Sequence, residues 1–127
     1  MNFEKVIFAF FIVLALTLNF GFFLGDIDNP AHHNVFELFA AIVVSLIATV
    51  LKAGDKTHLG AVLLATSLVA DLQLIIAAIV WGVAVHITQT GLTPGNMSAI
   101  ISLSGGALLA NITSVVLLVS ETLMVRR

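Results

Sequence analysis

Two polar side chains stand near the middle of long apolar runs, where a membrane protein would place residues that bind or pass ions. Asp71 is at the centre of one run, and Asn111 is at a similar depth in the next. An Asp at mid-span costs about 2.5–3.5 kcal/mol on insertion scales, so it normally faces a bundle interior, a cavity or a partner. We predict that Asp71 takes part in ion binding or conduction. The alternative is a structural hydrogen bond from Asp71 to Asn111 or to Asn19, which lies in the first run.

Small and polar residues recur at helical spacing through three of the apolar runs. Ser67 shares a helix face with Asp71, Ser104 shares one with Asn111, and Ser45 lies on a similar face of the second run. Close helix packing is one interpretation, because small residues let membrane helices approach and hydroxyls bond across the contact. The other interpretation is an ion path. The residues expected to line or brace such a path are Asp71, Asn111, Ser67, Ser104 and Asn19.

Acidic residues gather at the opposite side of the predicted membrane from the lysines. Asp26, Asp28 and Glu37 lie around the first connection, and His86 lies near the same side. Such a set of acids concentrates cations locally. We therefore predict that Asp26, Asp28, Glu37 and His86 form the outer mouth of an ion path.

The adjacent histidines His32 and His33 are weak candidates for metal ligands. Their spacing from the neighbouring acids matches no defined metal motif, and turn formation, capping and solvation explain the segment as well. No phosphate loop or catalytic motif occurs along the chain. We expect no cofactor and no enzymatic activity.

The composition determines the solvent in which these residues must be positioned. Of 127 residues, 60% are hydrophobic and 9% charged, against about 45–50% and about 25% in soluble domains. The net charge of −2 gives no basic surface for nucleic acid. The absence of cysteine excludes disulfides and thiolate metal sites. We predict a single integral membrane domain whose solvent is the lipid bilayer.

Four apolar runs approach or exceed the roughly 20 residues that a spanning helix needs. They cover about 6–25, 35–51, 59–85 and 97–125. We predict an all-α integral membrane protein with four transmembrane helices in one domain, 1–127. The first run carries bulky side chains nearly all round, so it is expected to be the helix most exposed to lipid.

The basic residues predict the orientation. With four spans, all five fall on one side of the membrane, and positive residues mark the cytoplasmic face. Both termini are therefore expected in the cytoplasm, and the compact spans favour a bacterial inner membrane. The five are Lys5, Lys52, Lys56, Arg126 and Arg127.

Four packed helices fill their own centre, so a conducting protein of this size needs several copies, most simply around a symmetry axis. The leading hypothesis is a homo-oligomeric, cation-preferring channel with Asp71 on or beside the path, since acidic rings favour cations. The first alternative is a proton- or cation-coupled small transporter. The second is a non-transporting accessory subunit of a membrane complex.

Overall fold

The computed structural model describes residues 3–25 and 29–125, and the chain is helical as predicted. Four helices are long and apolar enough to cross a membrane. Their bounds are α1 Phe3–Phe23, α2 Val35–Lys52, α3 His58–Gly82 and α4 Pro94–Val125. A short 3-10 turn, η1 (Pro30–His32), precedes α2, and α3 continues through a π-helical turn, η2 (Val83–Ile87).

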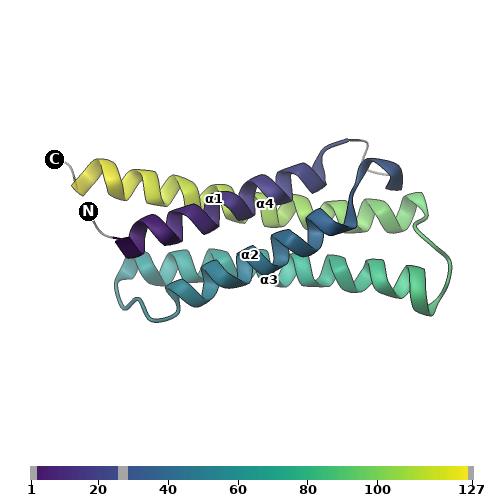
Figure 1. Ribbon diagram of the computed structural model, residues 1–127, viewed down its shortest axis with the longest axis horizontal. Coiled ribbons are helices and arrows are strands. Elements are labelled where there is room, and N and C mark those ends of the chain that lie inside the picture. The colour runs from purple at the N-terminus through teal and green to yellow at the C-terminus, as the bar shows by residue number, and fades with distance from the viewer. Residues whose placement is uncertain (1–2, 26–28, 126–127) are drawn as a thin grey trace.

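The helices form an up-down-up-down bundle (Figure 1). The main contacts join α1 to α2, α2 to α3, α3 to α4 and α4 back to α1. Both termini and the α2–α3 turn lie at one end of the bundle, and this end carries Lys5, Lys52 and Lys56. We call it the lysine end and the opposite end the Glu37 end. Asp26, Asp28, Arg126 and Arg127 lie outside the described residues.

The expectation that the first span is the most lipid-exposed stays a prediction, because α1 and α2 each bury five residues. α1 nevertheless has a continuous buried face, with steps of four, three, four and three residues, which keeps one side of the helix against its neighbours. Exposed aromatic side chains on the other faces hide this pattern in the sequence. The buried face consists of Phe8, Ile12, Ala15, Asn19 and Phe22.

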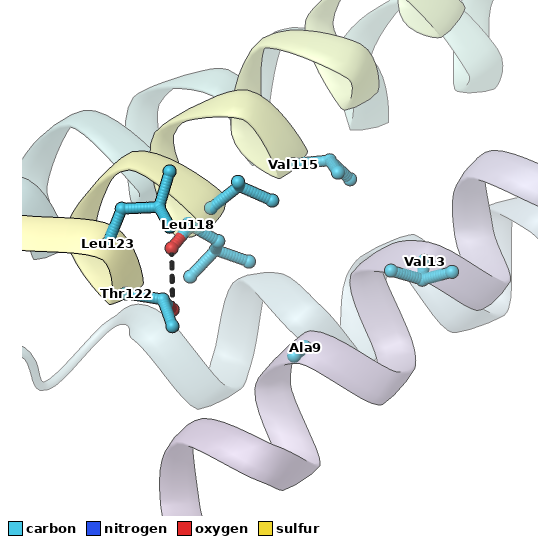
Figure 2. Close-up of a pocket in the computed structure, with 7 residues that line it drawn as sticks. Ala9, Val13, Val115, Leu118, Thr122 and Leu123 are labelled. Atoms are coloured by element: carbon cyan, nitrogen blue, oxygen red, sulfur yellow. Dashed lines mark hydrogen bonds between the residues drawn. The ribbon is translucent and has the colours of Figure 1, made fainter. Parts of the chain in front are cut away.

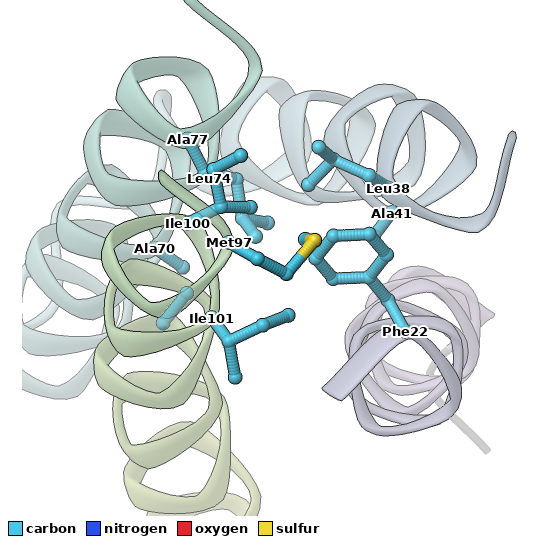
Figure 3. Packing of buried hydrophobic residues seen from close by; sticks show 10 residues of the cluster. Phe22, Leu38, Ala41, Ala70, Leu74, Ala77, Met97, Ile100 and Ile101 are labelled. Carbon is cyan, nitrogen blue, oxygen red and sulfur yellow. The ribbon is translucent and has the colours of Figure 1, made fainter. Parts of the chain in front are cut away.

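The buried apolar residues form two separate clusters. The cluster toward the Glu37 end includes Phe22, Leu38, Leu74 and Met97, and the Met97 sulfur lies beside the Phe22 ring (Figure 3). Contacts between sulfur and aromatic rings are favourable. The lysine-end cluster consists of Phe8, Ile12, Ala48 and Leu63. The interior between these two clusters is polar.

A hydrogen-bonded cap begins α3 at the lysine end. The Thr57 hydroxyl accepts a bond from the Gly60 N–H at 2.9 Å and donates to Asp55 Oδ1 at 2.7 Å. Asp55 Oδ1 also accepts the Thr57 backbone N–H at 2.9 Å. The Thr57 hydroxyl, its backbone N–H and the Lys52 ammonium hold the pKa of Asp55 below its ordinary value of 3.8.

This cap predicts an acid-sensitive contribution to stability. A carboxyl with a lowered pKa in the folded state stabilises the fold above its ordinary pKa, and the contribution disappears as pH falls through the lowered value. We expect wild-type protein in detergent to lose thermal stability below pH 3.8 more steeply than Asp55→Asn. Equal slopes of unfolding temperature against pH for the two proteins would contradict the assignment.

Candidate functional site

Asp71 lies inside the bundle, and its carboxyl is bracketed by two hydroxyls of α2. The Ser45 Oγ is 2.6 Å from Asp71 Oδ1, and the Thr49 Oγ1 is 2.5 Å from Asp71 Oδ2. Ser45 and Thr49 are one helical turn apart, so both face the same carboxyl. Asp71 is only 5% exposed. The three side chains form a compact polar contact between α2 and α3.

The predicted structural partners of Asp71, Asn111 and Asn19, were wrong. The positions of Asn111 and Asn19 along their helices made them candidate partners of Asp71. The Asp71 side chain, however, points to α2 rather than to α1 or α4. Asn19 bonds instead to α4: its Nδ2 donates to the Ser104 carbonyl at 3.0 Å, and the Ser104 Oγ donates to Asn19 Oδ1 at 2.5 Å. This reciprocal pair, fully buried, fixes α1 against α4.

A third polar contact sets the register of α3 against α4. The Thr66 Oγ1 and the Ser114 Oγ are 2.5 Å apart. Each residue of a helix adds a rise of about 1.5 Å along the helix axis. Measured along the axis from the Thr66–Ser114 contact toward the Glu37 end, Asn111 therefore lies at about 4.5 Å and Asp71 at about 7.5 Å. Asn111 is therefore placed at a depth between Ser67 and Asp71.

Two buried side chains at this depth lack hydrogen bonds. The Ser67 Oγ and both polar atoms of the Asn111 amide have no partner among the described residues. Ser67 is fully buried and Asn111 is 1% exposed. A buried polar group without a partner lowers the free energy of unfolding by about 1–3 kcal/mol. Packing alone therefore explains neither the Asn111 amide nor the Ser67 hydroxyl. We define the polar layer as Ser45, Thr49, Ser67, Asp71 and Asn111.

The predicted outer mouth is only partly described. Glu37 is half-buried in the first turn of α2, and its carboxylate lies over Gly21 of α1, where an added Cβ would be 2.2 Å from Oε2. His86 is exposed on η2. The Glu37 carboxylate, in the first turn of α2, interacts favourably with the N-terminus of that helix. The predictions for Asp26 and Asp28 fall outside the described residues.

The histidine candidates do not form a metal centre with their described neighbours. His33 is buried, its Nδ1 lies 2.5 Å from the Phe22 carbonyl oxygen, and its ring packs on the Phe22 ring with centroids 5.7 Å apart. These contacts tie the segment before α2 to the end of α1. Among residues 3–25 and 29–125, no group of three or more His, Cys, Asp or Glu could hold a metal ion. The side chain of His32 is not among those described.

A cavity of about 690 Å³ opens at the lysine end. Its charged lining consists of Glu4, Lys5, Lys52 and Asp55, and its apolar lining consists of Ile7, Phe8, Val50 and Leu51. The Lys52 ammonium lies 4.5 Å from the centroid of the Phe8 ring and 3.4 Å from Asp55 Oδ2. Phe8 itself is 1% exposed. The Phe8 ring therefore belongs both to the lining of this charged cavity and to the buried lysine-end cluster.

The groove between the outer faces of α1 and α4 is apolar, unlike the charged cavity at the lysine end. It measures about 250 Å³ and is lined mainly by aliphatic side chains, including Ala9, Val13 and Val115 (Figure 2). Its Thr122 hydroxyl donates to the Leu118 carbonyl of its own helix. This groove lies on the outer surface of the bundle, and its aliphatic lining offers no chemistry for an ion.

The fold and the polar layer define the chain as an α-helical membrane protein with four candidate spans around a buried carboxyl. The chain belongs to the family of unknown function DUF6394, which matches residues 32–122. The match includes every residue of the polar layer, whereas Phe8 and Asn19 lie before it. Comparisons with curated proteins and with solved structures gave no match.

Proposed function

We propose that the protein transports a cation or a proton across the membrane and that Asp71 is the ion-binding carboxyl. The observation that carries the proposal is a carboxyl buried at mid-span with hydroxyl partners only. Within the described residues, Asp71 has no ion pair with Lys, Arg or His, and its hydrogen-bond partners are Ser45 and Thr49. An Asn would make structural hydrogen bonds at lower cost in lipid. A titratable acid is justified there if it loads and releases an ion.

A carrier fits this interior better than an open path through one chain. Fully buried apolar side chains close the polar layer toward both ends: Phe22 and Leu38 on one side, and Phe8 and Leu63 on the other. Transporters commonly place such a site near the bilayer midplane and expose it to the two sides in turn. The arrangement therefore supports a coupled transporter in an occluded conformation.

The channel form of the proposal requires several copies around a common axis, because the centre of one bundle is filled. In that form Asp71 braces α2 and α3 beside the path, since its carboxyl faces the bundle interior. For either form we propose that the lysine end faces the cytoplasm of a bacterial cell, following the positive-inside rule.

The proposal is tested by ion flux into liposomes containing the purified protein. Fluxes of H⁺, Na⁺, K⁺ and Ca²⁺ are compared for wild type, Asp71→Asn and the control Glu4→Gln, which removes an exposed carboxylate. We expect wild-type flux and a loss of about tenfold or more in Asp71→Asn, which corresponds to at least about 1.4 kcal/mol. Glu4→Gln should keep the wild-type rate.

The kinetics of the same flux separate the two forms. Saturable flux driven by a pH gradient supports a carrier, whereas large unitary currents support a channel. No flux of any tested ion from folded protein would overturn the transport proposal and favour an accessory subunit. Equal flux in wild type and Asp71→Asn would remove Asp71 from the mechanism.

A further inference from the structure

The Thr49 hydroxyl makes two contacts that one proton cannot serve if Asp71 is ionised. Thr49 Oγ1 lies 2.9 Å from the Ser45 carbonyl oxygen and 2.5 Å from Asp71 Oδ2. A hydroxyl has a single proton to donate, and a carbonyl or carboxylate oxygen can only accept. With an ionised Asp71, two acceptors compete for the same proton. The proton then serves one contact, or is shared and serves both only weakly.

A proton on Asp71 Oδ2 resolves this competition. The carboxyl O–H then donates to Thr49 Oγ1, and the Thr49 hydroxyl donates to the Ser45 carbonyl. The Ser45 Oγ donates to Asp71 Oδ1 at 2.6 Å, the oxygen that stays carbonyl-like in a carboxylic acid. Every group in the chain of bonds is satisfied when Asp71 is neutral.

The surroundings favour the same state. Lys52 is the one titratable residue among the described buried residues of α1, α2 and α4. Its ammonium lies against Asp55 and the Phe8 ring, at the lysine end. The side of α4 nearest in depth presents the neutral Asn111. An ionised carboxyl buried without a counter-charge is far more costly than a neutral one.

We infer that Asp71 carries a proton in this closed conformation and that the Asp71–Ser45–Thr49 cluster is a proton-binding site. This inference rests on the proposed function and specifies its ion. In transport, the Asp71 O–H bond breaks, its proton passes to a water molecule as hydronium, and a carboxylate remains until a proton returns from the other side. The unpaired Ser67 and Asn111 supply hydrogen bonds for that water, which needs two to four polar partners.

The test measures the protonation of Asp71 directly. Aspartate labelled with ¹³C at its carboxyl is incorporated into the full chain, which contains four aspartates, namely Asp26, Asp28, Asp55 and Asp71. Solid-state NMR of the protein in liposomes at pH 7 then separates protonated from ionised carboxyls by chemical shift. We expect one protonated resonance, absent from Asp71→Asn and retained in the matched control Asp55→Asn.

The outcomes distinguish this inference from the transport proposal. A protonated Asp71 with flux driven by a pH gradient supports both. A protonated Asp71 in a folded protein that transports nothing supports the proton site and overturns the transport proposal. An ionised Asp71 at pH 7 overturns the proton site, even if Na⁺ or K⁺ flux shows that the protein transports ions.

Discussion

Replacing Phe8 by alanine is expected to connect the lysine-end cavity to the polar layer and to make the protein leak protons. Phe8 packs on Ile12, Ala48 and Leu63 and is one of the apolar residues that line the 690 Å³ cavity. Removing a buried Phe ring costs about 3–5 kcal/mol, because the surrounding side chains close the space only partly. The substitution also removes the ring beneath the Lys52 ammonium. A water-filled connection would bypass the coupling that an occluded site provides.

Phe10→Ala is the matched control, on the same helix and with the same atoms removed. Phe10 is 61% exposed on the outer face of α1, so its loss should leave the interior closed. The measurements are passive proton flux into liposomes and the unfolding of each variant in detergent. We expect faster leak and a lower unfolding temperature for Phe8→Ala only. Equal leak in the two variants would show that Phe8 is not a barrier.

Much of the fold could be predicted from the sequence, because lipid leaves few solutions for long apolar runs. Four continuous runs predict four helices, since backbone groups in a bilayer must bond within the helix. The same physics predicted that Asp71 faces a bundle interior, a cavity or a partner, and the structure buries it inside the bundle. Depth along each helix is also readable, because each residue adds about 1.5 Å.

The partners of Asp71 could not be predicted in the same way. Depth placed Asn111 and Asn19 as candidates, but the choice among three neighbouring helices depends on side-chain direction and packing order. Thr49 was missed, although its position one turn from Ser45 put two hydroxyls on one face of α2. Pairing hydroxyls at helical spacing with the acid at mid-span is the signal that would have found it.

The two buried asparagines show why residue type and burial do not define a role. Asn19 and Asn111 are both almost fully buried. The amide of Asn19 exchanges two hydrogen bonds with Ser104. That of Asn111 has no partner among the described residues. Asn19 therefore contributes to stability, whereas Asn111 lowers it. We propose that Asn111 is kept because it binds water that enters the polar layer.

The same substitution at both positions separates these roles. Asn19→Leu should destabilise the bundle by about 1–3 kcal/mol, because it leaves the buried Ser104 hydroxyl without its partner. Asn111→Leu should be neutral or stabilising, because leucine has the same number and branching of side-chain heavy atoms and no polar atoms to leave unsatisfied. Unfolding in detergent and flux in liposomes are measured on the same preparations. For Asn111→Leu we expect flux to fall while stability holds.

An Asn111→Leu variant that unfolds as readily as Asn19→Leu would contradict this division, since the amide would then stabilise the fold through a partner of its own. An Asn111→Leu variant that is stable and fully active would show instead that the polar layer transfers protons without Asn111. The combination of retained stability and reduced flux is specific to a residue kept for ion movement. Stability holds because no hydrogen bond among the described residues depends on the Asn111 amide, and flux falls because entering water has lost a polar partner at a depth close to that of Asp71.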